Sequence, residues 1–403
     1  MPINLIAVRQ VFLTFLRLGF TSFGGPVAHV GFFRKELVER QKWVNDSQFS
    51  QLLAISQFLP GPASSQLGFS LGFLKAGWLG ALAAFLAFTL PSVFILLAFA
   101  YFLPYLSGEL GGLSGALLGQ AGLQGLKLVA FAVVADAVLG MSQKLCSDVS
   151  RKAIAIISAC ILLLLEATVF QIVVVLFGAL AGMLLIRQEA VANDSGLQVG
   201  YSSRSGLVLL VVFFILLAGL PLLADQSMLM ALSDAFYRAG ALVFGGGHVV
   251  LPLLEESVVG TGWVNQENFL AGYGASQAIP GPMFSFSAYL GGLIDTGYAS
   301  WVGALIALVF MFLPGFILML AVLPIWQSLS QNNLAIKAIA GINAAVVGLL
   351  AVALYDPVFV SGVASRLDLA IAVFGFAMLS IWKLSPVYVV IWCVSASMLA
   401  TMI

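Results

Sequence analysis

The chain has 403 residues, of which 61% are hydrophobic and 8% are charged, and its formal net charge is zero. A soluble domain carries roughly a quarter charged residues, so lipid must be the main solvent, and the neutral net charge gives no electrostatic reason to expect a nucleic-acid partner. The three cysteines and two histidines show no metal-ligand or disulfide spacing, which predicts no metal and no cofactor.

Apolar runs close to the ~20 residues that cross a bilayer recur along the chain. They cover residues 81–101, 169–186, 207–223, 302–323 and 387–402. One such run could be a signal peptide, but this many cannot. The sequence therefore predicts an all-α polytopic membrane protein.

In chain order, the first interruption of an apolar stretch is Phe23-Gly24-Gly25-Pro26. Glycine allows positive φ and has no side chain, so the backbone of Gly24 and Gly25 could approach a ligand; close helix packing is the alternative. Arg17 precedes this phrase inside the same apolar stretch. An arginine at membrane depth costs at least ~2.5 kcal/mol on insertion scales and usually faces a cavity or a partner. Its guanidinium suits a tetrahedral oxyanion, whereas snorkelling or an ion pair with Asp136 is the alternative.

Pro60-Gly61-Pro62 is the second interruption. Proline lacks an N–H and clashes with the preceding turn, so one helix should end before this phrase and another should begin within it. The new helix presents unpaired N–H groups, which are costly at membrane depth, and its N-terminus favours an anion. A pair of proline kinks without a ligand is the alternative. The substrate-binding residues predicted here are Gln57, Gly61, Ser64 and Ser65.

Two charged residues occupy the apolar stretch 123–138. Lys127 and Asp136 lie more than two turns apart on one predicted helix. Lys127 either contacts the substrate or pairs with Asp136. Asp136 is a candidate for coupling transport to protons, because an ionisable group inside a membrane is usually functional.

The second half of the chain repeats the order of the first. Phe23-Gly24-Gly25, Trp43-Val44-Asn45 and Pro60-Gly61-Pro62 are matched by Phe244-Gly245-Gly246, Trp263-Val264-Asn265 and Pro280-Gly281-Pro282. The asparagines in the middle phrases are predicted N-caps. Such a duplication in an apolar chain is typical of a transporter built from two repeats. The substrate-binding residues predicted in the second copy are Arg238, Gly245, Gly246, His248, Gln277, Gly281 and Ser285.

The predicted domains are a first repeat at 1–187, a polar loop with an unmatched apolar helix at 188–225, and a second repeat at 226–403. An extra crossing between repeats that each cross an even number of times turns the second repeat upside down. In each copy, two broken and re-entrant helix pairs should precede four full crossings; broken pairs that cross fully are the alternative.

The distribution of charge supports this inversion independently. The segment 34–42 carries four cations and two carboxylates, whereas the equivalent segment of the second copy carries Glu255 and Glu256 and no cation. Loops that are rich in Lys and Arg favour the cytoplasmic side. The N-terminus is therefore predicted to be cytoplasmic and the C-terminus exterior.

The paired phrases resemble the chromate ion transporter family, whose two-domain members carry an early Phe-Gly-Gly-Pro phrase and a later Pro-Gly-Pro phrase. Phe23-Gly24-Gly25-Pro26, Pro60-Gly61-Pro62 and Pro280-Gly281-Pro282 fit this pattern, whereas Phe244-Gly245-Gly246-Gly247-His248 departs from its proline form. The resemblance spans nearly the whole chain. It implies antiparallel domains and the export of chromate across the cytoplasmic membrane, with chromate resistance as the result and sulfate as the related oxyanion.

The residues themselves indicate a cavity at the helix breaks that suits an anion, and the first hypothesis is a secondary transporter for a divalent tetrahedral oxyanion. The chain has no Walker motif, so ATP is not expected to drive it directly. An anion channel, or a transporter of sulfate or another oxyanion, is the alternative. An enzyme that uses Ser64, Ser65 or Ser285 is disfavoured, because neither histidine holds a consistent position relative to a serine. Chromate or sulfate and the lipid bilayer are the predicted partners, and the sequence allows a homodimer. Arg17→Gln and Arg238→Gln are each predicted to abolish transport without preventing membrane insertion.

Overall fold

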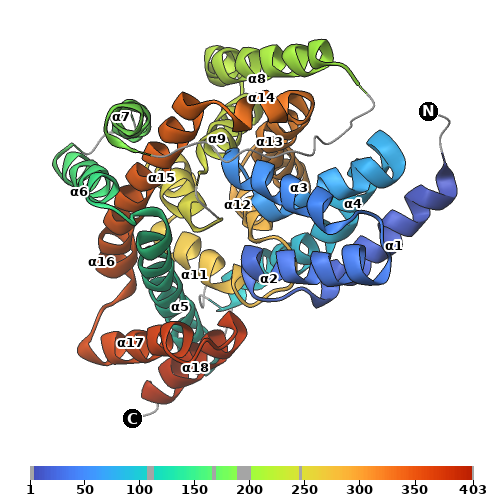
Figure 1. Ribbon diagram of the computed structural model, residues 1–403. Helices are drawn as coiled ribbons and strands as arrows, with labels where there is room; N and C mark the ends of the chain where they lie inside the picture. The colour runs from blue at the N-terminus through green and yellow to red at the C-terminus, as the bar shows by residue number, and fades with distance from the viewer. Residues whose placement is uncertain (1–3, 107–112, 166–168, 188–200, 245–246, 402–403) are drawn as a thin grey trace.

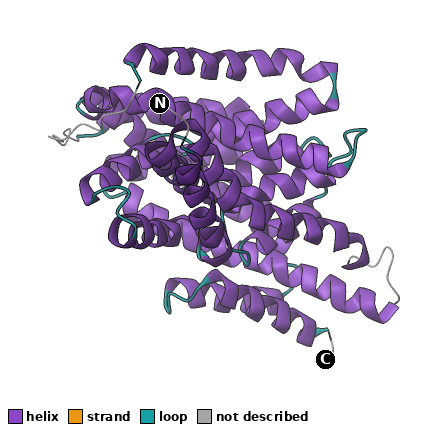
Figure 2. Ribbon diagram, turned by 90° about the vertical axis from the view of Figure 1, so that its right-hand side faces the viewer, coloured by secondary structure: helices purple, strands orange, loops and turns teal. Residues whose placement is uncertain are grey.

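The computed structural model describes residues 4–106, 113–165, 169–187, 201–244 and 247–401, and all regular structure in these ranges is helical (Figures 1 and 2). Five helical segments of the described chain are long and apolar enough to cross a membrane: Ala63–Leu106, Leu117–Leu145, Ser203–Gln226, Ser300–Ile325 and Asn333–Gly362. The prediction of an all-α polytopic membrane protein is confirmed.

The first half follows the predicted order of two broken helix pairs and four further helices. The helices are α1 (Leu5–Thr21), α2 (Gly25–Phe33), α3 (Asp46–Phe58), α4 (Ala63–Leu106), α5 (Leu113–Leu145), α6 (Val149–Leu164) and α7 (Val169–Leu185). A widened turn at Arg34–Arg40 continues α2. The angles at Ala76 and Gly77 are not helical, so α4 consists of two helices.

The second half repeats this order after α8 (Ser203–Leu223), which runs along the edge of the molecule in Figure 1. Only 11% of its apolar, membrane-length stretch is buried against the rest of the protein. Its helices are α9 (Met228–Leu242), α10 (Val250–Val258), α11 (Gln266–Ser276), α12 (Phe286–Leu293), α13 (Ser300–Val322), α14 (Trp326–Ser330), α15 (Asn333–Ala353), α16 (Val360–Gly362), α17 (Arg366–Ser380) and α18 (Pro386–Ala400). By their order, α9 to α11 match α1 to α3, α12 and α13 match the two parts of α4, and α15, α17 and α18 match α5 to α7.

Local chemistry explains where the helices that lead into the Pro-Gly-Pro phrases begin. The Asn45 side chain accepts a hydrogen bond from the Gln48 amide at 2.8 Å, and the Asn265 side chain accepts one from the Asn268 amide at 2.8 Å. Each bond satisfies an amide that the first turn of the helix leaves unpaired. The predicted N-caps are confirmed, and the two halves start these helices in the same way.

The last two helices of each half pack on a helix of the other half, which is α5 in the first half and its match α15 in the second. α5 contacts α17 and α18, and α15 contacts α6 and α7. Small residues make this contact close: a Cβ on Gly341 would lie 2.0 Å from the Gly178 carbonyl oxygen. Close approach at glycine is the standard way in which membrane helices associate. Contacts that are exchanged in this manner are those of a two-fold relation between the halves.

A two-fold axis can lie in the membrane plane or along its normal, and only the first inverts the second half. We expect single cysteines at Glu39 and Glu255, in a chain without Cys146, Cys160 and Cys393, to react with a membrane-impermeant thiol reagent from opposite faces of the membrane. Glu39 is exposed, and Glu255 lines an open pocket. Labelling of both positions from the same face would contradict the inverted arrangement.

Candidate functional site

Both Pro-Gly-Pro phrases interrupt the helices where the sequence predicts. α3 ends at Phe58 before α4 begins at Ala63, and α11 ends at Ser276 before a short turn at Met283–Ser285 leads into α12. Gly61 has a φ of +116° and Gly281 a φ of +95°, and glycine adopts such angles without the steric penalty that other residues incur. Gly24 and Gly25 also have positive φ, at +99° and +74°.

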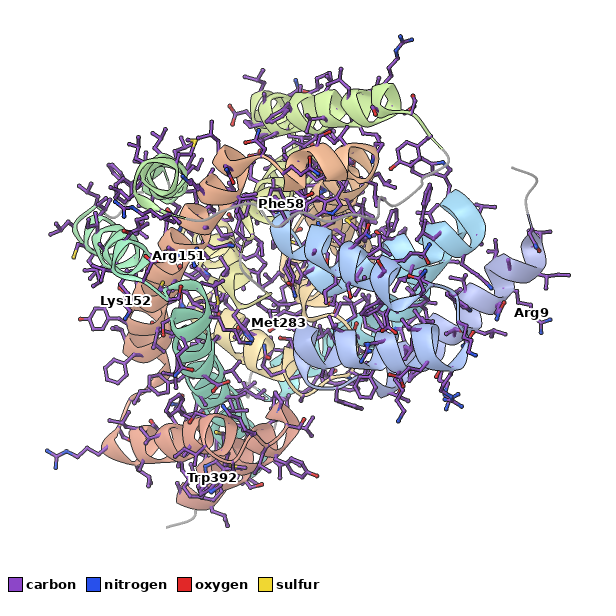
Figure 3. All side chains as sticks on the ribbon, in the orientation of Figure 1. Arg9, Phe58, Arg151, Lys152, Met283 and Trp392 are labelled. Carbon is purple, nitrogen blue, oxygen red and sulfur yellow. The ribbon has the colours of Figure 1, made fainter. Side chains whose placement is uncertain are left out.

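Each break is hydrogen-bonded to the opposite half of the chain. The Gly61 amide donates to the Val243 carbonyl at 2.7 Å, and the Gly281 amide donates to the Ser22 carbonyl at 3.0 Å. Ser22 and Val243 each stand immediately before a Phe-Gly-Gly phrase. The breaks of both halves therefore meet in one region, and Met283, labelled near the middle of Figure 3, marks it.

The beginning of α4 provides the donors expected of an anion site. Its first intrahelical bond runs from the Gln66 amide to the Pro62 carbonyl at 2.9 Å, so the amides of Ala63, Ser64 and Ser65 precede the bonded part of the helix. The Ser65 hydroxyl is buried, and among the described residues it has no hydrogen-bond partner. These groups lie at the end of a helix dipole that favours negative charge.

His29 links three elements at this break and was not predicted as a site residue. Its ring is fully buried; Nε2 lies 3.2 Å from the Ser22 carbonyl oxygen, and Nδ1 lies 3.3 Å from the Ser64 hydroxyl. A carbonyl only accepts, so we assign the proton to Nε2, and Nδ1 then accepts from Ser64. His29 does not align with His248, so the repeat did not mark it as a site residue.

Gln66 is the second buried polar residue that the sequence analysis missed. Its Nε2 donates to the Pro60 carbonyl at 2.8 Å and to the Gly315 carbonyl at 3.0 Å. Its Oε1 is buried without a partner in the described part of the chain. Its position could have indicated a role, because Gln66 is a polar residue one turn beyond a helix break in a very apolar chain.

The second break differs because its serine hydroxyls donate hydrogen bonds to carbonyls of the same segment. The hydroxyls of Ser285 and Ser287 donate to the carbonyls of Pro282 and Phe284. The Gln277 amide group lies 3.1 Å from the sulfur of Met283, and His248 Nδ1 lies 2.9 Å from the Tyr273 hydroxyl. Gln57, the counterpart of Gln277, is exposed on α3. Gly245 and Gly246 lie outside the described residues.

The two matched arginines have different surroundings. Arg238 forms an ion pair of 2.6 Å with Asp234, whose side chain is 5% exposed. The residue equivalent to Asp234 in the first half is Leu13. Arg17 instead lines an open pocket of about 400 Å³ between α1 and the α2 segment. This difference was visible in the sequence, since a carboxylate one turn before an arginine is a common helical pair.

The predicted pairing of Lys127 with Asp136 is wrong. Lys127 Nζ lies 3.6 Å from a carboxylate oxygen of Glu267 on α11. Lys127 and Asp136 are nine positions apart on one helix, and only positions three or four apart face each other. Lys127 thus ties α5 to the helix that enters the second break. A substrate contact for Lys127 and a coupling role for Asp136 remain predictions.

Comparison with known proteins agrees with this architecture. The family model of the chromate transporter matches residues 9–183 and again 230–398. A probable chromate transport protein of Synechococcus elongatus is 30% identical over 386 residues, which cover 94% of this chain and 91% of the relative. A chromate transport protein of Pseudomonas aeruginosa is 28% identical, covering 93% of this chain and 87% of the relative.

A chromate transport protein of Cupriavidus metallidurans is 28% identical over 348 residues, covering 85% of this chain and 80% of the relative. No solved structure matches the chain. The chain therefore belongs to the chromate transporter family, whose named relatives are transport proteins and not enzymes.

Proposed function

We propose that this protein is a secondary transporter that exports chromate across the cytoplasmic membrane and thereby confers chromate resistance. The observation that carries the proposal is the meeting of two helix breaks from opposite halves, joined by the Gly61–Val243 and Gly281–Ser22 hydrogen bonds. Discontinuous helices that meet between two repeats form the substrate sites of many secondary transporters. The names of the relatives supply chromate as the substrate.

The start of α4 is the part of this region best suited to the anion. Its unpaired amides and the Ser65 hydroxyl, which has no partner among the described residues, can donate hydrogen bonds to oxyanion oxygens. Chromate and sulfate have the same charge and nearly the same shape, so these donors would hold either anion. Sulfate is therefore proposed as a competing ligand.

The membrane potential favours the proposed direction. An inside-negative potential is worth ~2.3 kcal/mol per charge per 100 mV, which is about 4.6 kcal/mol for a dianion leaving the cell. The chain carries no Walker motif through which ATP could drive the process. We propose that the membrane potential drives export, either alone or together with anion exchange or proton coupling. We also propose that the N-terminus is cytoplasmic and the C-terminus exterior.

Proteoliposomes that contain the purified chain test this function. We expect uptake of labelled chromate that saturates, is reduced by sulfate and responds to an imposed potential at fixed pH. Unlabelled chromate on the far side should accelerate uptake, because a carrier returns faster when it is loaded. Saturable flux without this counterflow effect would favour an anion channel of the same fold, and absence of chromate flux would refute the proposal.

A further inference from the structure

The pocket beside Arg17 is a cation-rich cavity whose lining includes no residue of either Pro-Gly-Pro break. We refer to it as the basic pocket. It has a volume of about 400 Å³ and lies between α1, which contributes Thr14, Arg17 and Thr21, and the continuation of α2, which contributes Lys35, Glu36, Arg40 and Gln41. Three cations and one carboxylate line it, so its formal charge is 3 − 1 = +2.

The single carboxylate of the basic pocket is already satisfied. Glu36 accepts hydrogen bonds from Arg40 at 2.9 Å and from Gln41 at 2.8 Å. The Gln41 hydrogen bond, followed by the charge of Arg40, holds the pKa of Glu36 below its usual value. Glu36 therefore stays ionised and pairs with Arg40. It also interacts with the charge of Arg17, but more weakly, so the basic pocket keeps an excess of positive charge.

Arg17 and Lys35 have no carboxylate within 4.0 Å in the described part of the chain. Arg34, the residue before Lys35, is paired with Asp46 at 2.8 Å. The equivalent arginine of the second half, Arg238, is paired with Asp234. Arg17 is thus the one of the two matched arginines whose guanidinium is free to bind an anion, and it has a cavity in front of it.

We propose that the basic pocket is a second anion-binding site, which captures a divalent tetrahedral oxyanion from the cytoplasm before the anion reaches the helix breaks. The proposal rests on the proposed transport function. Arg17 supplies the paired N–H donors that fit two oxyanion oxygens. Lys35 adds a second positive charge that has no ion pair within the described residues. Thr14 and Thr21 line the same space, and the Thr21 hydroxyl donates to the Arg17 carbonyl at 2.9 Å.

A pocket of opposite charge, lined by residues of both halves, agrees with this assignment. It has a volume of about 380 Å³ and is lined by Glu255, Glu256, Asp356 and Gln171, with no cation among its lining residues. The sequence places Glu255 and Glu256 in the segment equivalent to 34–42. Clefts lined by one sign of charge raise the local concentration of oppositely charged ligands. The basic pocket therefore favours anion capture, whereas the acidic pocket disfavours it.

Two measurements on the full-length protein test the basic pocket. In everted vesicles that present the cytoplasmic face outward, Arg17→Gln and Lys35→Gln should each raise the KM for chromate about tenfold at low ionic strength. For Arg17→Gln, this weaker capture replaces the complete loss of transport expected from the sequence alone. The increase in KM should become smaller when salt is added. The Debye length is ~10 Å at 0.1 M salt, and exposed charges that are farther apart are largely screened. Equilibrium binding of labelled sulfate to the purified protein should weaken in both variants.

Arg9→Gln is the matched control. Arg9 is exposed on the same helix but outside the basic pocket, at the outer end of α1 in Figure 3, and its loss removes the same charge. Arg17→Lys should recover part of the affinity. Equal KM values and equal sulfate binding in Arg17→Gln and Arg9→Gln would overturn the proposal, as would a lower maximal rate with an unchanged KM.

The outcomes separate this proposal from the transport function. Wild-type protein without chromate flux would refute the transport function, while sulfate binding that is lost in Arg17→Gln would still support the basic pocket. Normal wild-type flux with no difference between Arg17→Gln and Arg9→Gln would refute the pocket alone. If Arg17→Gln fails to fold, Lys35→Gln decides, because Lys35 is exposed and forms no ion pair within the described residues.

Discussion

Gly61→Ala is expected to abolish chromate transport. Gly61 has a φ of +116°, and a non-glycine residue held in such a conformation costs about 1–3 kcal/mol. The new Cβ would also lie 2.9 Å from the Gln66 side chain and 3.0 Å from the Cα of Gly315 on α13. The strain can relax only if α13 moves away or the Gly61–Val243 hydrogen bond breaks, and either change opens the junction of the two halves. Flux in proteoliposomes and the melting temperature should both be measured.

Gly281→Ala should behave in the same way, because the added Cβ would meet the Ser92 hydroxyl at 3.0 Å and the Phe88 carbonyl oxygen at 3.2 Å. Gly140→Ala is the matched control: it lies in α5 without a positive φ, and no heavy atom lies within 4 Å of its added Cβ. We expect wild-type flux from the control. Wild-type flux from Gly61→Ala at equal protein levels would show that the break is not part of the transport machinery.

Arg238→Gln is expected to destabilise the folded protein, and transport should fall because less protein is folded. The substitution leaves the carboxylate of Asp234, whose side chain is 5% exposed, without its partner at 2.6 Å. Breaking a buried ion pair costs about 3–5 kcal/mol, and an exposed pair contributes about 1 kcal/mol or less. Because the Arg238 side chain is 40% exposed, we expect a loss between these limits, seen as a lower melting temperature in detergent.

A double substitution tests whether Arg238 acts through its ion pair with Asp234 or by binding the substrate. Asp234→Leu combined with Arg238→Gln places leucine where the first half has Leu13, and it should restore most of the lost stability. Arg17→Gln should leave the melting temperature unchanged, since Arg17 has no such partner in the described chain. An Arg238→Gln variant that melts like the wild type and yet transports nothing would instead make Arg238 a substrate ligand, as the sequence alone predicts.

The elements that could be predicted from sequence depend on interactions within a few residues. Proline removes an N–H, so the breaks at Pro60-Gly61-Pro62 and Pro280-Gly281-Pro282 follow from the residues themselves. The caps formed by Asn45 and Asn265 are equally local. Apolar runs long enough to form membrane helices are a property of composition.

The binding residues were harder to predict, because equivalence in sequence does not imply equivalent partners. The Ser65 hydroxyl has no partner among the described residues, whereas Ser285, its match, donates to Pro282. Lys127 pairs with Glu267 and not with the aspartate on its own helix. His29 and Gln66 acquire their roles from groups that approach them from other helices. Such pairings arise only after distant segments pack together, and periodicity carries no information on them.

The sequence by itself determined that the chain is an all-α membrane protein with a repeated order of helices and matched breaks, because helix formation, capping and helix termination are decided by neighbouring residues. Only the tertiary structure decided that each break bonds to the other half. It also decided that Arg238 is paired with Asp234, whereas Arg17 lies beside a cavity and has no ion pair in the described part of the chain. The physical reason is that hydrogen bonds and ion pairs depend on which groups packing brings within about 3 Å of each other, and a single exchange such as Leu13 for Asp234 makes two matched sites chemically different.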